Sequence, residues 1–177
     1  MEVKEKKKKN AESVAEKTYQ NQQLIVFRLG QEEYALHIDQ VKEVVITPHI
    51  TRMPQTPSFV RGVANIRGNI IAIIDLEEKF GLSVGLEEPS KQANNFTLVI
   101  ESEEFKIGVL VKEVPNTLSI SEADIEETSN VIHEAGVESG YIKGVAKSGD
   151  RLIILIDILK IMSEKEFDML TRKQALA

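Results

Sequence analysis

Short runs of apolar residues alternate with polar ones along most of the chain, which is the pattern of β-strands rather than of long helices. The first two runs, Gln23–Leu29 and Tyr34–Ile38, flank a polar turn that contains Gly30 and predict a β-hairpin. Shorter strands are predicted at Val44–Ile46 and Ile50–Met53. The opening third of the chain is therefore expected to be almost entirely β.

A second hairpin is predicted within Val60–Asp75, with its turn at Arg67–Asn69. Leu76–Gly81 follows as one helical turn that ends at Gly81, because glycine accepts the backbone conformation that ends a helix. The next segment, 84–94, contains Gly85, Pro89 and Ser90, which is typical of a surface linker.

The same order of elements returns after this linker. Four further strands are predicted from the apolar runs, paired into two hairpins, and they are Phe96–Ser102, Phe105–Val111, Ile142–Ala146 and Arg151–Ile156. A single strand between these hairpins is suggested by Val114, Leu118 and Ile120.

The chain ends with a predicted helix over 163–177. Ser163 and Glu166 have the spacing of a capping box, in which the two side chains satisfy each other's free backbone amides. Phe167 and Leu170 would lie on one face of that helix.

Two segments resemble each other closely enough to suggest an internal duplication. Gly62–Leu76 and Gly144–Ile158 align without gaps, and six of their fifteen positions are identical, including Asp75 and Asp157. Chance similarity between two apolar hairpins is the alternative. A duplication predicts two small β-barrels, with halves at about 22–82 and 94–158, because closing a sheet removes its exposed edges.

Composition limits where the protein works. The chain has 177 residues and no cysteine, so it has no disulfides, no thiolate zinc site and no cysteine nucleophile. Its longest apolar runs, Ile70–Ile74 and Leu152–Ile156, hold five residues each, whereas a membrane span needs about 20. We therefore expect a cytoplasmic protein without direct membrane insertion.

Charge is distributed unevenly along the chain. The whole chain has a net charge of −6. Residues 1–21 carry six lysines and four glutamates, a balance of +2, so the rest of the chain has a net charge of −8. The lysine-rich segment is interpreted as a flexible tail. An acidic body repels phosphate backbones, so no nucleic-acid partner is expected.

The residues that could carry catalysis are few. A duplicated β protein with one aspartate in each half, Asp75 and Asp157, raises the hypothesis of an aspartic protease. Both aspartates directly follow apolar strands, however, and are better explained as caps of the next helical turn. His37, His49 and His133 show no metal-ligand spacing, and no glycine-rich phosphate loop is present. We expect no catalytic residue, cofactor or metal.

Arg61–Gly68 is the segment most typical of a functional site. Gly68 permits a positive φ at a hairpin tip, Asn65 can bond the turn backbone, and Arg67 would then project outward. A plain hairpin with a solvated arginine is the alternative interpretation.

These segments resemble the CheW family of chemotaxis coupling proteins. The resemblance covers about residues 22–162 and is most specific in 24–44, 56–81 and 141–161. Ala72 is a departure, since family members usually have proline there. The resemblance implies an all-β fold of two five-stranded SH3-like barrels around a shared apolar core.

The resemblance also implies a non-catalytic adaptor between two kinds of partner. These would be the cytoplasmic tips of methyl-accepting chemotaxis receptors and the regulatory domain of the histidine kinase CheA, within receptor arrays. A CheW-like scaffold of a non-chemotaxis two-component pathway is the alternative. By motif position, the receptor-facing groove would involve Val41, Glu43, Gly62, Val63, Asn65, Ile66, Arg67 and Gly68, with Val99 and Val109 from the other barrel.

Overall fold

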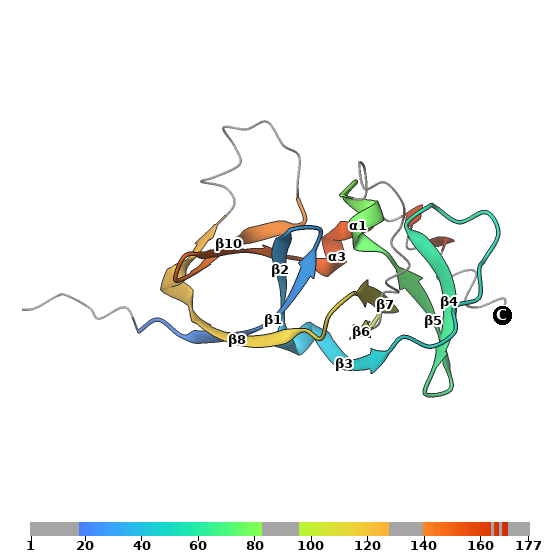
Figure 1. Ribbon diagram of the computed structural model, residues 1–177, viewed down its shortest axis with the longest axis horizontal. Helices are drawn as coiled ribbons and strands as arrows, with labels where there is room; N and C mark the ends of the chain where they lie inside the picture. The colour runs from blue at the N-terminus through green and yellow to red at the C-terminus, as the bar shows by residue number, and fades with distance from the viewer. Residues whose placement is uncertain (1–17, 83–95, 128–139, 164, 167, 170–177) are drawn as a thin grey trace, which may run out of the picture.

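Strands make up most of the computed structural model, which describes residues 18–82, 96–127, 140–163, 165–166 and 168–169 (Figure 1). The expected linker at 84–94 and most of the expected tail lie outside these residues. The strands are β1 Asn21–Leu29, β2 Glu32–His37, β3 Val41–Ile46, β4 Val60–Ile66, β5 Asn69–Ile74, β6 Phe96–Glu101, β7 Lys106–Val111, β8 Asn116–Ser121, β9 Ile125–Glu127, β10 Ile142–Ser148 and β11 Arg151–Ile156. The short helices are α1 Leu76–Lys79 and α3 Ile158–Ile161, with 3-10 turns η1 Ile38–Gln40 and η2 Glu122–Asp124.

The strands form two sheets that each curl into an SH3-like barrel. Barrel A has the strand order β8-β1-β2-β11-β10-β9, and barrel B has the order β3-β6-β7-β5-β4. Figure 1 shows barrel A on the left and barrel B on the right, with α1 and α3 between them. The all-β, two-barrel architecture expected from the sequence is confirmed, although barrel A has a sixth strand, the three-residue β9.

Each barrel combines strands from both halves of the chain, so the expected division at 22–82 and 94–158 does not coincide with the barrels. The third strand of each half crosses over: β3 pairs with β6, placing Val44 opposite Leu98, and β8 pairs with β1, placing Leu118 opposite Leu24. This exchange gives the first strand of each half a second hydrogen-bonding neighbour, which an isolated half would lack.

The duplication itself is visible in the strand pairing. Each half contributes one parallel contact, β5 with β7 and β11 with β2, among otherwise antiparallel pairs. The aligned hairpins β4–β5 and β10–β11 also share a register shift after their first residue, at Val60–Gly62 and at Ile142–Gly144. The two halves therefore repeat the same local geometry while exchanging strands.

Several predicted elements differ in extent from the structure. Ile50–Met53 is not a strand; Thr51 alone forms an isolated bridge, to Val63. The strand predicted to include Val114 begins only at Asn116, after Pro115, whose ring fixes φ away from the value of an antiparallel strand. The sequence interpretation also missed β9, which is too short to produce a periodic pattern.

Among the residues that the structure describes, three apolar clusters stabilise this arrangement. The largest lies between the barrels and receives side chains from both, among them Phe27, Leu36, Ile74 and Ile100. A second cluster fills barrel A and a third fills barrel B. Alternate residues of β1 thus face different clusters: Ile25 and Phe27 face the central one, and Leu24 and Val26 face the interior of barrel A. The shared core expected between two barrels is therefore present.

The predicted helix caps are confirmed. Asp75 accepts a hydrogen bond from the Glu78 amide at 3.2 Å, and Asp157 accepts one from the Leu159 amide at 3.0 Å. Ser163 and Glu166 form the reciprocal pair of a capping box, with N···O distances of 2.7 and 3.3 Å. The expected apolar face of the final helix, Phe167 and Leu170, lies outside the described residues.

Helix α1 also holds neighbouring elements together through its charged side chains. Glu77 accepts a hydrogen bond from the Gly30 amide in the β1–β2 turn at 3.0 Å and pairs with Lys112 at 3.2 Å. Lys79 donates to Glu166 at 2.7 Å and lies 4.2 Å above the Phe59 ring. The position of barrel A against barrel B is therefore fixed by polar contacts as well as by apolar packing.

Candidate partner-binding site

The tip of the β4–β5 hairpin is a two-residue turn that presents Arg67 to solvent. Arg67 and Gly68 both have positive φ, 51° and 85°, the combination that the hairpin turn following the right-handed strand twist requires. The Asn65 carboxamide oxygen accepts a hydrogen bond from the Gly68 amide at 2.9 Å. The predicted roles of Asn65 and Gly68 are confirmed, and the Arg67 side chain is 73% exposed.

An ion pair connects this tip to β3, the strand at the opposite edge of the sheet. Arg67 Nε donates to Glu43 Oε2 at 2.6 Å. Such exposed pairs contribute only about 0–1 kcal/mol to stability. The ion pair instead positions the Arg67 guanidinium beside β3, and the remaining N–H donors of the guanidinium stay available to another molecule.

Gly62 and Val63 position the hairpin through their backbone. The Val63 N–H and C=O each bond to Thr51 at 2.8 Å. Gly62 has φ of +143°, and a Cβ atom there would lie 2.1 Å from the Thr51 carbonyl oxygen. Only glycine fits this close approach. Gly62 therefore supports the site from within, and no side chain of its own reaches a partner.

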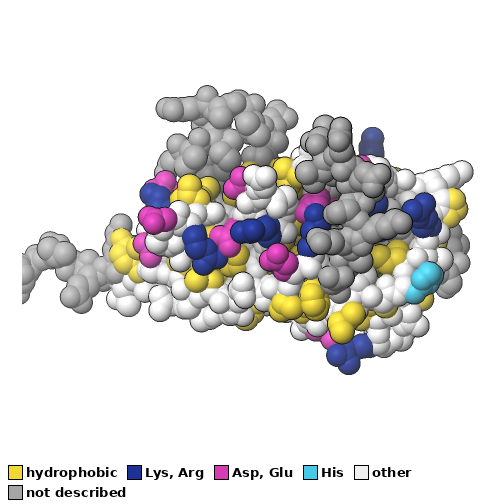
Figure 2. Space-filling model, in the orientation of Figure 1, with side chains coloured by type: hydrophobic (Ala, Val, Ile, Leu, Met, Phe, Trp, Pro, Cys, Tyr) yellow, Lys and Arg dark blue, Asp and Glu magenta, His cyan; other side chains and the backbone are white. Residues whose placement is uncertain are grey.

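Exposed apolar side chains lie on the two elements that the ion pair connects, β3 and the β4–β5 hairpin. Ile46 is 80% exposed, Val44 41% and Ile70 46%. Figure 2 shows hydrophobic side chains along the lower edge of the molecule, over β3 and beside the β4–β5 hairpin, with charged side chains among them. We call this area the β3–hairpin surface and define it by Glu43, Val44, Ile46, Asn65, Arg67 and Ile70.

The sequence interpretation did not select Val44, Ile46 or Ile70. The signal that could have found them lies in β3, where apolar residues occupy both faces although the strand stands at a sheet edge. Val45 packs on the core of barrel B, so its neighbours Val44 and Ile46 must point the other way. An apolar residue on the outer face of an edge strand is a liability unless something covers it.

Three of the predicted groove residues are buried and cannot line a surface. Ile66 and Val99 are 5% and 1% exposed inside barrel B, and Val109 is 0% exposed in the central cluster. Val99 and Val109 moreover lie in the same sheet as Arg67 and not in the other barrel. Val41 is half-buried against the central cluster. These four residues support the site from beneath.

Asp75, one of the aspartates considered for catalysis, has a structural partner in Arg61. Arg61 donates to Asp75 Oδ2 through Nε at 3.0 Å and through Nη2 at 2.5 Å, and Asp75 is 6% exposed. Burial, with a contribution from Lys143, lowers the pKa of His37. Within the described parts of the chain, no three His, Cys, Asp or Glu side chains gather to hold a metal ion. No helix among those parts is long and apolar enough to cross a membrane.

Comparisons with known proteins agree on one family. The model of the CheW-like domain matches residues 23–166. The "Chemotaxis protein CheW" of Treponema pallidum (strain Nichols) is 32% identical over 148 residues, which cover 84% of this chain and 86% of that protein. The protein of the same name from Klebsiella aerogenes is 33% identical over 145 residues, covering 82% and 84% of the two chains.

A solved structure shows the same fold. The crystal structure of the scaffolding protein TtCheW from Thermoanaerobacter tengcongensis superposes with a TM-score of 0.70 at 33% sequence identity, covering 83% of this chain and 96% of that one. Family model, relatives and structure thus coincide over the two barrels described above. The chain belongs to the CheW-like domain family.

Proposed function

We propose that this protein is a non-catalytic adaptor of bacterial chemotaxis, which joins the cytoplasmic tips of chemoreceptors to the regulatory domain of the histidine kinase CheA. The names of its relatives, chemotaxis and scaffolding proteins, support the pathway. The observation that carries the proposal is the β3–hairpin surface, where an exposed arginine on a tight turn stands beside an apolar edge strand.

This surface suits the face of an amphipathic helix, which is the shape of a receptor tip. Val44, Ile46 and Ile70 would receive the apolar stripe of the helix. Arg67 would fix the register by donating to a carboxylate or to helix carbonyls, a type of bond stronger than one between neutral groups. Binding requires no bond to be made or broken, so the function is one of placing two proteins together.

Coupling requires that two surfaces be used at once. With the β3–hairpin surface facing a receptor, the kinase domain would contact a different face, at a barrel end. Individual affinities are expected to be modest, and an array beneath the membrane would gain its stability from many linked contacts.

The test is the variant Arg67→Glu, measured by calorimetry against a receptor cytoplasmic fragment. The substitution places a carboxylate beside Glu43 and removes the donor, so we expect receptor binding to weaken by about 1–3 kcal/mol. The fold should remain intact, because the side chain is largely solvent-exposed. Unchanged affinity in a folded variant would refute the assignment of this surface.

Two controls separate partner binding from local structure. Arg151→Glu breaks a comparable exposed ion pair in barrel A, with Glu33, and should leave receptor affinity unchanged. The double variant Glu43→Arg/Arg67→Glu restores the internal ion pair with reversed charges. If the receptor contacts these charges directly, the double variant should still bind the receptor weakly. If the ion pair only supports the hairpin, the double variant should bind with the affinity of the parent protein.

A further inference from the structure

Strand β8 leaves β1 before β1 ends. The pairing runs from Asn21 opposite Ser121 to Val26 opposite Asn116, while β1 continues to Leu29. If the register continued, Pro115 would stand opposite Phe27, and its ring fixes φ at about −65°, which departs from the backbone of an antiparallel strand. Val114, which would stand opposite Arg28, is outside the strand and 61% exposed. The last three residues of β1 therefore have no β8 residue beside them.

The backbone of Arg28 faces this gap. The β1–β2 hairpin closes at Leu29 opposite Glu32 through a two-residue turn, and in such hairpins the closing pair exchanges hydrogen bonds. Because bonding alternates along an antiparallel strand, the N–H and C=O of Arg28 point away from β2, toward the side that β8 has left. One donor and one acceptor thus point away from β2 at a position that β8 does not reach.

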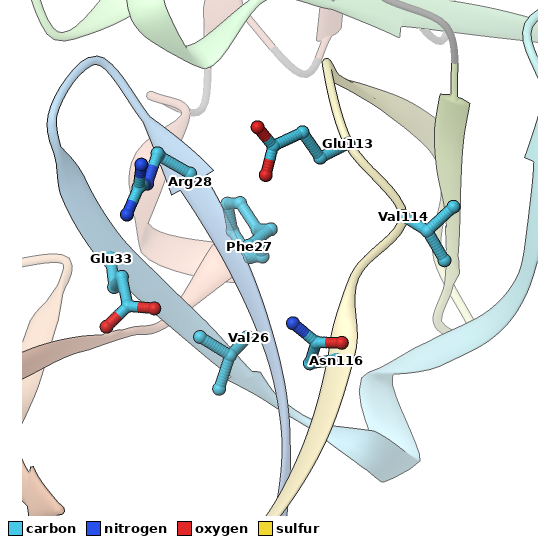
Figure 3. Close-up of a pocket in the computed structure, with 7 residues that line it drawn as sticks. All are labelled: Val26, Phe27, Arg28, Glu33, Glu113, Val114 and Asn116. Carbon is cyan, nitrogen blue, oxygen red and sulfur yellow. The ribbon is translucent and has the colours of Figure 1, made fainter.

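A cavity lies at this place. Its volume is about 190 Å³, and its lining comes from the end of β1, from Glu33 of β2 and from the segment that leads into β8. Figure 3 shows Glu113 and Asn116 projecting toward β1 from one side, with Arg28 on the other side and Val114 pointing away. The space that the next residues of β8 would have filled is therefore open and lined by polar groups.

The charges on the two walls are of opposite sign. On one wall, Arg151 donates to both oxygens of Glu33, at 2.8 and 2.9 Å, and these bonds hold the pKa of Glu33 below its ordinary value, with Arg28 adding to the effect. Two guanidinium groups against one carboxylate leave this wall positive. On the other wall, no described residue forms a hydrogen bond or ion pair with the Glu113 carboxylate.

We propose that this cavity binds a short extended peptide segment of another protein, which adds beside β1 as a continuation of β8. One peptide residue would exchange two backbone hydrogen bonds with Arg28. An acidic side chain at that residue would face Arg28, and a basic side chain nearby would pair with Glu113, because opposite charges are favoured across strands. The site lies on barrel A, apart from the β3–hairpin surface, and accepts a strand instead of a helix.

The test follows the Arg28 amide by nuclear magnetic resonance in the full chain. The probe is the heptapeptide acetyl-Thr-Lys-Val-Glu-Val-Lys-Thr-amide, and its analogue with glutamine in place of the charged residues is the comparison. We expect hydrogen exchange at the Arg28 amide to be fast in the free protein and at least fivefold slower at saturating peptide. The neutral analogue should bind more weakly.

Variants make the outcome specific. Glu113→Gln should raise the Kd for the charged peptide by up to about fivefold, the range of an exposed ion pair, whereas Glu104→Gln, at the distant β6–β7 turn, should leave it unchanged. Pro115→Thr removes the ring that fixes φ at this position and should lower peptide affinity by letting β8 extend. An Arg28 amide already protected in the free protein, equal binding of both peptides, or an unchanged Kd in Glu113→Gln would each overturn the proposal.

Discussion

At the scale of single residues, positions that need a particular backbone shape were predictable, and burial was not. Asn65 and Gly68 take the turn roles that their chemistry indicated. Ile66 and Ile70 have the same side chain on the same hairpin, yet one is 5% exposed and the other 46%. That difference depends on which strands lie above and below, information that a local motif does not contain.

Gly62 should tolerate substitution worse than Gly68. Gly62→Ala would drive a Cβ into the Thr51 carbonyl at 2.1 Å, so we expect about 2–4 kcal/mol of lost unfolding free energy, measured by urea denaturation. Gly68→Ala meets nothing within 4 Å and should cost only about 1 kcal/mol, for its positive φ. Equal losses in the two variants would contradict the close approach of Thr51.

The two capping aspartates should also differ. Asp75 is buried and holds both Arg61 and the start of α1, so Asp75→Asn should cost about 2–3 kcal/mol in thermal or urea unfolding. Asp157 serves only as a more exposed cap of α3, and Asp157→Asn should cost at most about 1 kcal/mol. If Asp157→Asn lost more unfolding free energy than Asp75→Asn, Asp75 would not be the more important of the two caps.

At the scale of elements, each hairpin was predictable, and the partners of the third strands were not. Alternating apolar residues with polar turns between them indicated β1–β2, β4–β5, β6–β7 and β10–β11 without knowledge of the rest. The pattern of β3 fits a neighbour in either half equally well, because the halves are similar. The pairing of β3 with β6 is decided by the fit of the whole molecule.

The capping box formed by Ser163 and Glu166 should weaken in acid. Burial pushes the pKa of Glu166 upward, but hydrogen bonds from Lys79 and the Ser163 amide outweigh it, so the pKa is lowered overall. A lowered pKa in the folded state means that the stabilisation is present above the unfolded pKa and is lost as pH falls through the folded value. Protonation in acid therefore removes the stabilisation that the ionised Glu166 carboxylate contributes to the folded state.

Glu166→Gln provides the measurement. We expect the variant to be less stable than the parent by about 1 kcal/mol at pH 7 and the two curves of unfolding free energy to converge below about pH 4. Urea titrations from pH 7 to pH 3 test this, with Glu104→Gln as a surface control that should run parallel to the parent. Curves that stay apart at pH 3 would exclude a role for the ionised carboxylate.

At the scale of the whole molecule, the shared cluster between the barrels indicates one cooperative unit. Phe27 of barrel A and Val109 of barrel B are buried in the same cluster, so neither barrel can open without exposing the other. We expect methyl resonances from the two barrel interiors, such as Leu155 and Val99, to report one coincident urea transition. Two separate midpoints would show that the barrels unfold independently.

Strands β3 and β8 each pair with a strand of the other half, and this exchange determines how the chain could be divided into two fragments. A break within 83–95 would separate β1–β5 from the remaining strands, and each piece would then hold an incomplete set of strands from both barrels. Neither piece should become ordered alone, but mixing the two should restore the native pairings. Two inactive fragments would thus regain binding only together, which makes the stretch between β5 and β6 a natural breakpoint for a split-protein reporter.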